Sequence, residues 1–218
     1  MTEHFLKVER TARYITLGEL TACTGRIWIA CHGYAQLASY FIKDLEPLLD
    51  ESTYIVAPEA LSRFYPKGFF GNVGASWMTK EDRLHEIEDY VGYLDKLYQT
   101  IIAAAPKDAE VNVLGFSQGC ATVCRWIQQR KPEIGKLWLC SGDIPQDLVF
   151  REFKAALKNS QLHILLGRED GLVSPEQVER VKTLLDSAEI TYELHLFNGG
   201  HVVNAELISR LANSKISE

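Results

Sequence analysis

A serine between two glycines, in GFSQG at residues 115–119, is the strongest sign of chemistry in this sequence. It directly follows the apolar run EVNVL and directly precedes CATVCRWIQQR, a run with helical periodicity. A serine at a sharp turn from a strand to a helix is held in a strained backbone conformation, and only small neighbours such as Gly115 and Gly119 leave room for it. The pattern therefore predicts a nucleophile, with the hydroxyl of Ser117 exposed above a sheet.

A serine hydroxyl is a weak nucleophile at neutral pH, so this hypothesis requires a base and a group that orients the base. His201, in NGGHV, is the candidate base because an imidazole with a pKa of about 6.5 can accept the serine proton and later return it. Asp170, in GREDGLVSPE, is the candidate for the orienting group. Each follows an apolar run that reads as a strand, so Ser117, Asp170 and His201 can meet at one edge of a sheet.

Other carboxylates and histidines compete for these roles. Glu169 is adjacent to Asp170, and Asp143, in SGD, also follows a predicted strand and stays an alternative acid. The remaining histidines lie within predicted strands, within a helix or near the terminus, and we expect them to be structural or solvated: His195, His163, His85 and His4.

A second loop with candidate functional groups is CHGYAQ, at residues 31–36, which follows the apolar run RIWIA. We expect the backbone N–H groups of Tyr34 and Gln118 to form an oxyanion hole, since Gln118 lies at the amino end of the predicted helix, where the helix dipole favours negative charge. The His32 side chain is expected to stabilise this loop by hydrogen bonds. The ring of Tyr34 is alternatively a wall of the substrate pocket.

The elements that position these residues alternate between strands and helices. Six strands are predicted, at residues 26–31, 53–58, 110–115, 136–142, 161–167 and 191–197. Apolar residues at three- and four-residue spacing predict a helix over residues 80–104, with Thr79 and Asp82 capping its start. The alternation predicts an α/β fold with a mostly parallel central sheet and helices on both faces, in which ligands bind beyond the carboxyl ends of the strands. Residues 4–22 are expected to form an antiparallel hairpin at the edge of the sheet.

The segment at residues 58–79 is too long for an ordinary connection and is rich in aromatic residues between glycines. We expect it to form a wall of the substrate pocket with Phe64, Tyr65, Phe69, Phe70 and Trp77. A lid that closes the hydrophobic core and a dimer interface are the alternatives.

Length and composition are those of one globular domain spanning all 218 residues, with residues 58–79 as a loop insertion. The net charge of −6 and the lack of a Lys/Arg-rich run argue against nucleic acid as a partner. Five cysteines without paired spacing indicate neither a disulfide framework nor a zinc site, and are expected to be small buried residues. Charges in the first ten residues and the lack of a long apolar run predict a cytoplasmic protein with no membrane span.

These residues together resemble the α/β-hydrolase superfamily and, within it, the phospholipase/carboxylesterase family that includes acyl-protein thioesterases. The resemblance covers about residues 26–213 and is carried by CHGY, APEA, GFSQG, GREDGLVSPE and GGH in the expected order. It implies Ser117, Asp170 and His201 as a catalytic triad. Two departures concern the oxyanion region: Cys120 stands where the family usually has a further glycine, and CHGYAQ lacks the Gly-Asp that often follows.

The expected function is hydrolysis of a small hydrophobic carboxylic ester through an acyl-enzyme intermediate, with no cofactor and no metal ion. The same triad would serve a thioesterase or a lysophospholipase-like enzyme, or cleave an amide bond. A hypothesis from another class is a ligand-binding protein that has kept the scaffold without catalysis. The expected partner is a small ester substrate, and the sequence does not distinguish a monomer from a homodimer.

Overall fold

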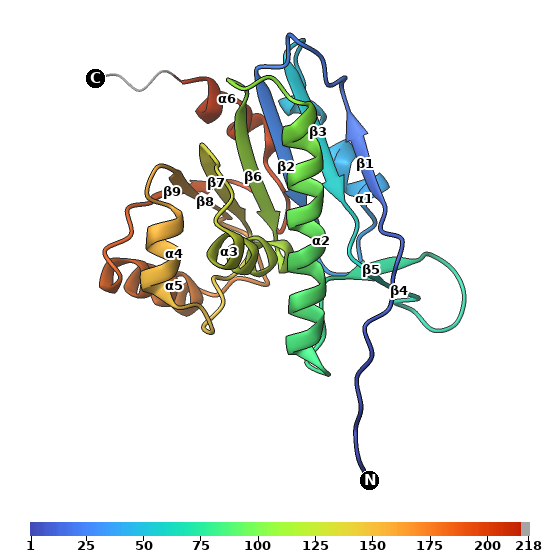
Figure 1. The fold of residues 1–218 in the computed structure, drawn as a ribbon. Coiled ribbons are helices and arrows are strands. Elements are labelled where there is room, and N and C mark those ends of the chain that lie inside the picture. The colour runs from blue at the N-terminus through green and yellow to red at the C-terminus, as the bar shows by residue number, and fades with distance from the viewer. Residues whose placement is uncertain (215–218) are drawn as a thin grey trace.

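Seven strands form one sheet in the order β1-β3-β2-β6-β7-β8-β9 in the computed structural model, which describes residues 1–214 (Figure 1). The strands of this sheet are β1 (Tyr14–Leu17), β2 (Arg26–Cys31), β3 (Thr53–Pro58), β6 (Glu110–Phe116), β7 (Lys136–Cys140), β8 (Gln161–Gly167) and β9 (Glu193–Phe197). All neighbours pair in parallel except β1, which is antiparallel to β3. The predicted mostly parallel sheet is therefore confirmed.

Helices cover both faces of this sheet (Figure 1). They are α1 (Ala38–Phe41), the 3₁₀ helix η1 (Ile42–Leu48), α2 (Arg83–Ala104), α3 (Gln118–Arg130), α4 (Phe150–Ala156), α5 (Pro175–Ser187) and α6 (Ala205–Asn213). Alternate residues of each strand enter two separate cores. One core packs the sheet against α2, α3, α4 and α5, and the other packs it against α1, η1 and α6. This two-sided burial explains why the central strands are almost continuously apolar.

Two local predictions are wrong. Residues 4–10 form no strand, and β1 pairs with β3 instead of closing a hairpin within residues 4–22, because β3 offers its unpaired edge to Tyr14–Leu17. At the start of α2, Asp82 is the N-cap residue in a left-handed conformation, and its side chain makes no cap. The carboxylate of Asp82 instead bonds His85 Nδ1 at 2.6 Å, and the N–H of Thr79 donates to Glu86.

The segment at residues 58–79 forms a small hairpin outside the main sheet, with β4 (Ser62–Phe64) antiparallel to β5 (Gly74–Ser76). The hairpin projects beyond the β1 and β3 side of the molecule (Figure 1).

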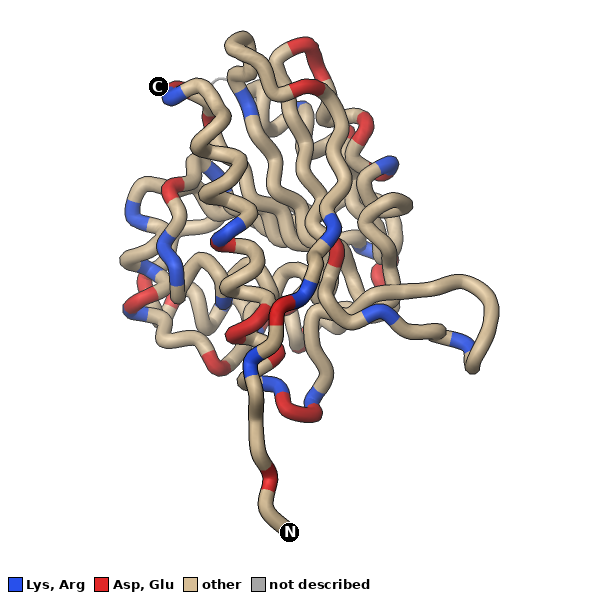
Figure 2. Tube along the Cα trace, turned by 45° about the vertical axis from the view of Figure 1, so that its right-hand side comes forward, with Lys and Arg blue, Asp and Glu red and all other residues tan. Residues whose placement is uncertain are grey.

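Basic and acidic residues are interspersed over the chain rather than gathered in blocks of one sign (Figure 2). Four cysteines are buried as expected, and Cys23 is exposed. Within residues 1–214, no helix is long and apolar enough to cross a membrane.

Candidate active site

Ser117 occupies the turn between β6 and α3. Its backbone has φ 52° and ψ −116°, in a region that side-chain-bearing residues rarely adopt, and its N–H donates to the carbonyl of Cys140 at 2.9 Å. A Cβ on Gly119 would lie 2.2 Å from the carbonyl oxygen of Cys31. Glycine at this position therefore lets the first turn of α3 pack directly on the end of β2, which fixes the turn that carries Ser117.

Asp170 and His201 lie in the loops that follow β8 and β9, and they form a hydrogen-bonded pair. Nδ1 of His201 lies 2.9 Å from Oδ2 and 3.1 Å from Oδ1 of Asp170. Burial opposes ionisation of Asp170, but hydrogen bonds from the Leu172 N–H and from His201 outweigh it, and the pKa of this carboxyl lies below its usual value. Because an ionised carboxylate only accepts, Nδ1 of His201 carries the proton and Nε2 is left as the basic nitrogen.

Glycine also brings these two loops together. A Cβ on Gly167, at the end of β8, would lie 2.3 Å from the carbonyl oxygen of Gly199 in the loop after β9. The N–H of Glu169 donates to the same carbonyl at 3.0 Å. The close approach of the loops places the acid within reach of the imidazole.

Ser117 and His201 line one cavity of about 250 Å³, called here the Ser117 cavity. Its other walls come mainly from α5, β8, β9 and the start of α3, and are lined by Gln118, Ala121, Ser141, Gly142, Asp143, Ile164, Leu166, Leu172, Val173, Gln177, Val178, Val181, Lys182, Tyr192 and Leu194. The ring of Phe116 packs against the imidazole of His201, with centroids 5.0 Å apart. No hydrogen bond joins Ser117 to His201 among the described residues, and in hydrolases such a contact often tightens only around the substrate.

Asp143, the alternative acid, also lines the Ser117 cavity but has a different partner. Its carboxylate forms an ion pair with Arg180 of α5, and His201 hydrogen-bonds to Asp170. Of the two carboxylates, the geometry therefore assigns Asp170 to the imidazole.

In the loop after β2, the N–H of Tyr34 lies between two N–H groups that have acceptors. The N–H of Gly33 donates to Gln36 Oε1 at 2.8 Å, and that of Ala35 donates to the carbonyl of Ala75 at 2.9 Å. Between them, the N–H of Tyr34 has no acceptor within residues 1–214. The side chain of Tyr34 is exposed and packs against the ring of Phe64, with centroids 5.2 Å apart.

His32 holds this loop through both ring nitrogens. Nδ1 lies 2.7 Å from the carbonyl oxygen of Gly33, and Nε2 accepts from the N–H of Ala60 at 3.1 Å. Burial lowers the pKa of His32, so the ring is neutral and Nδ1 is the donor. The fully buried imidazole of His32 therefore has a structural role, because both of its nitrogens bond to backbone groups.

The aromatic side chains expected to line the substrate pocket lie apart from the Ser117 cavity. None of Phe64, Tyr65, Phe69, Phe70 and Trp77 lines the Ser117 cavity. Phe69 and Phe70 are each 87% exposed at the tip of the hairpin, and Trp77 is 2% exposed in the core. The physical reason is the direction of the hairpin, which leaves the sheet on the β1 and β3 side (Figure 1). The cavity is instead lined by residues of α5, β8 and β9.

The side chain of Gln118 makes structural hydrogen bonds that the sequence did not predict. Its Oε1 accepts from the N–H of Trp77 at 3.1 Å, and its Nε2 donates to the carbonyl of Met78 at 2.8 Å. The side chain of Gln118 thus joins the aromatic segment to the start of α3. Cys120, which replaces the usual glycine, places Sγ 3.1 Å from the carbonyl of Gly115, in space left open by Gly142.

The model of the serine hydrolase (FSH1) family matches residues 29–207, which include Ser117, Asp170 and His201. The chain belongs to the serine hydrolase (FSH1) family. The expected resemblance to a serine hydrolase family is confirmed, and FSH1 is the family that the match names. No curated protein sequence matches the chain significantly.

Solved structures with the same fold include other hydrolases. Esterase PE8 is 22% identical, with a TM-score of 0.67 over 93% of this chain and 97% of its own. Acyl-protein thioesterase 2 from Zea mays is 18% identical, with a TM-score of 0.68 over 92% and 96%. A carboxylesterase from Mesorhizobium loti is 16% identical, with a TM-score of 0.69 over 93% and 95%. At these identities the likeness establishes the α/β-hydrolase fold.

Proposed function

We propose that this serine hydrolase cleaves small hydrophobic carboxylic esters through an acyl-enzyme intermediate, with Ser117, Asp170 and His201 as its catalytic triad. The observation that carries the proposal is the pair of hydrogen bonds between His201 Nδ1 and Asp170, on an imidazole that shares a cavity with Ser117. An imidazole held in this tautomer keeps Nε2 available for the serine proton.

The reaction runs in two acyl transfers. Ser117 Oγ attacks the ester carbonyl carbon while its proton passes to Nε2 of His201. The imidazolium then gives this proton to the departing alkoxide, and the acyl group stays on Ser117. Water, deprotonated by His201, attacks the acyl-enzyme, releases the carboxylic acid and returns the proton to Ser117. Asp170 stays ionised throughout and stabilises the imidazolium.

The negative charge on the carbonyl oxygen would be bound by the N–H groups of Gln118 and Tyr34. The first N–H groups of a helix have no intrahelical acceptor, and Gln118 is the first residue of α3. The N–H of Tyr34 has no acceptor within residues 1–214, which supports its use as the second donor. Two such donors are worth about 3 kcal/mol each in acyl-transfer enzymes.

The walls of the Ser117 cavity support this substrate class. Beyond Ser117, much of the cavity wall is aliphatic, with Ile164 and Leu166 of β8, Val178 and Val181 of α5, and Leu194 of β9. A volume of about 250 Å³ is below the range of about 300 to 1,000 Å³ that is usual for drug-sized ligands, which supports a short, apolar acyl group.

The test is pre-steady-state hydrolysis of p-nitrophenyl esters by wild type and Ser117→Ala. We expect wild type to release a burst of about one equivalent of p-nitrophenol, followed by slower turnover. Ser117→Ala should show no burst and a steady-state rate lower by about 10³-fold or more. Equal activity in the two proteins would refute the proposal.

The leaving group is decided by a matched series of oxygen esters, thioesters and amides with one acyl group. Faster turnover of oxygen esters supports a carboxylesterase, and faster turnover of thioesters would assign a thioesterase with the same triad. Tight binding of the esters without turnover would instead identify a ligand-binding protein.

A further inference from the structure

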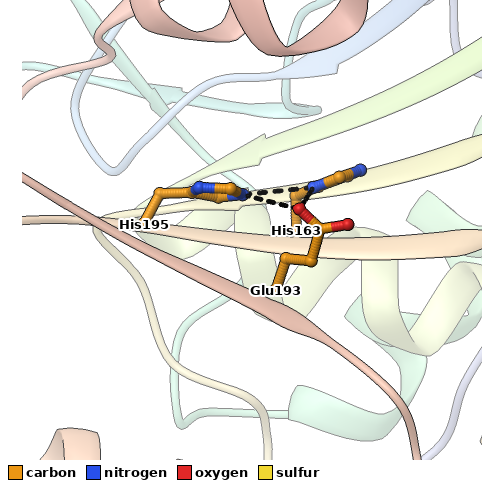
Figure 3. Close-up of side chains that lie close together, drawn as sticks. All are labelled: His163, Glu193 and His195. Carbon is orange, nitrogen blue, oxygen red and sulfur yellow. Dashed lines mark hydrogen bonds and ion pairs between the residues drawn. The ribbon is translucent and has the colours of Figure 1, made fainter. Parts of the chain in front are cut away.

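Two histidines and a glutamate lie together at the end of the sheet opposite the Ser117 cavity. His163 is in β8, and Glu193 and His195 are in β9; the three form what we call the His163 cluster (Figure 3). We propose that the His163 cluster binds one divalent cation of the zinc type, with Nδ1 of His163, Nε2 of His195 and a carboxylate oxygen of Glu193 as ligands.

Strand register brings these residues together although they are far apart in sequence. His163 pairs directly with Glu193 across the parallel β8–β9 ladder. Glu193 and His195 are two residues apart on one strand, so their side chains share a face of the sheet. This is the face that α6 covers, where Trp138 stacks on the imidazole of His163 with centroids 4.1 Å apart.

The three ligand atoms are spaced as a tetrahedral metal ion requires. His163 Nδ1 lies 3.2 Å from His195 Nε2 and 3.6 Å from Glu193 Oε2, and the remaining distance, from His195 Nε2 to Glu193 Oε2, is 3.5 Å. Zinc bonds of about 2.0 Å in tetrahedral geometry separate two ligands by about 3.3 Å. Octahedral coordination with bonds of similar length would need about 2.9 Å. The spacing therefore favours zinc over an ion that prefers six ligands.

The electrostatic surroundings support a cation at this position. The nearby ammonium of Lys136 is neutralised by Glu110, at 2.9 Å. Two neutral imidazoles and one carboxylate are a donor set that zinc enzymes use with water as fourth ligand.

Water can reach the fourth position from an open groove. This groove, of about 440 Å³, is lined by His163 and Glu193 together with the polar residues Glu110, Lys136, Asn159, Gln161 and Ser214. Nε2 of His163 has no hydrogen-bond partner among the described residues. Since an unsupported histidine typically costs 10- to 100-fold in metal affinity, we expect binding weaker than that of structural zinc sites.

A bound cation would join the edge strand β9 to its neighbour β8. The β9 strand pairs with β8 alone in the main sheet and leads into the loop that carries His201. At a hundredfold excess of zinc over its Kd, the site should raise Tm by about 5 to 10 °C.

The experiment titrates metal-stripped protein with Zn²⁺ against a chromogenic chelator and compares wild type with Glu193→Gln and His195→Gln. We expect one equivalent bound by wild type and an affinity at least tenfold lower in each variant. The Co²⁺ complex of wild type should show the strong visible absorption of tetrahedral cobalt. Because the Glu193 side chain is 61% exposed, Glu193→Gln should fold normally and keep the test valid if His195→Gln does not.

Two controls separate the His163 cluster from other histidines. His85→Gln removes an exposed imidazole on α2, and His201→Gln removes the one beside Ser117; both should bind Zn²⁺ as wild type does. Unchanged affinity in Glu193→Gln, loss of affinity in His201→Gln, or no stoichiometric binding by wild type would each overturn the proposal.

Discussion

Asp170 and Asp143 are two carboxylates at the same edge of the sheet, and they are expected to respond differently to substitution. Asp170→Asn should lower kcat by about 10³- to 10⁴-fold, because an amide at this position no longer fixes the imidazole tautomer that leaves Nε2 basic. Asp143→Asn removes the partner of Arg180 and should change kcat by less than about tenfold. Steady-state ester hydrolysis measures both, with circular dichroism to check folding. A larger loss of kcat in Asp143→Asn than in Asp170→Asn would show that Asp143 is the residue that orients His201.

Acyl-chain length should be set by α5 and not by the aromatic hairpin. Val178→Phe places a larger side chain in the Ser117 cavity and should lower kcat/KM for an octanoyl ester by at least about tenfold, with acetyl ester turnover nearly unchanged. Phe69→Ala, at the exposed hairpin tip, is the matched control and should leave both within about twofold. A larger effect of Phe69→Ala on the octanoyl ester would place the acyl group against the hairpin.

Individual site residues differed in how far the sequence could predict them. The sequence could indicate Ser117, Asp170 and His201 as a candidate triad because each follows a strand, and parallel strands bring such residues to one edge. The cavity walls could not, because Val178 and Leu194 carry no sign of function beyond being apolar. The contact between His163 and His195 could not be predicted for another reason. It depends on the register of β8 and β9, which the pattern of each strand alone does not give.

At the scale of elements, the turn from β6 to α3 depends on a close approach between backbones. Gly119→Ala would place a Cβ 2.2 Å from the carbonyl of Cys31, so α3 must shift away from β2. We expect the free energy of unfolding to fall by about 3 kcal/mol, as in other strongly overpacked sites. Gly92→Ala, on α2 with open space around it, should instead be neutral or stabilise by up to about 1 kcal/mol. Urea unfolding measures both variants, and equal stabilities would contradict this account of the turn.

Most elements could be predicted because their apolar patterns are strong. The strand at residues 26–31 and that at residues 161–167 are found at the predicted bounds. The start of α2 and the N-terminal strand could not be placed, because each depends on a tertiary partner. Asp82 bonds His85 instead of capping the helix, and Tyr14–Leu17 form a strand where the edge of β3 is available.

At the scale of the whole molecule, Glu59 joins the N-terminal segment to the hairpin. Its buried carboxylate accepts from Arg13 and Arg63, each at 2.6 Å. Burial opposes ionisation, but these two guanidinium groups outweigh it and hold the pKa of Glu59 below the usual 4.5. The resulting stabilisation is present above that pH and is lost as the pH falls through the folded-state pKa.

Glu59→Gln should therefore lower the free energy of unfolding at pH 7, by about 2 kcal/mol given that both arginines are partly exposed. The difference from wild type should shrink as the pH is lowered from 5 to 3. Urea unfolding over this range is the measurement, with Glu51→Gln on an exposed turn as the control. A difference that does not depend on pH would show that the charge of Glu59 contributes nothing.

At the scale of the whole fold, the two proposed sites lie at opposite ends of the same strands. The loops after β6, β8 and β9 carry the proposed triad, and the amino ends of β8 and β9 carry the His163 cluster. The order of strands in the sheet could not be predicted from the sequence alone. The apolar pattern of each strand does not indicate its neighbours, such as the position of β7 between β6 and β8.

Covalent labelling by a fluorophosphonate tests the central claim most directly, since it requires the serine, its base and the oxyanion donors to act together. Intact-mass measurement of wild type should show one adduct, and peptide mapping should place it on Ser117. Ser117→Ala should stay unlabelled, and His201→Gln should react at least about 10³-fold more slowly. Unmodified Ser117 in folded wild type, or rapid labelling of His201→Gln, would contradict the account.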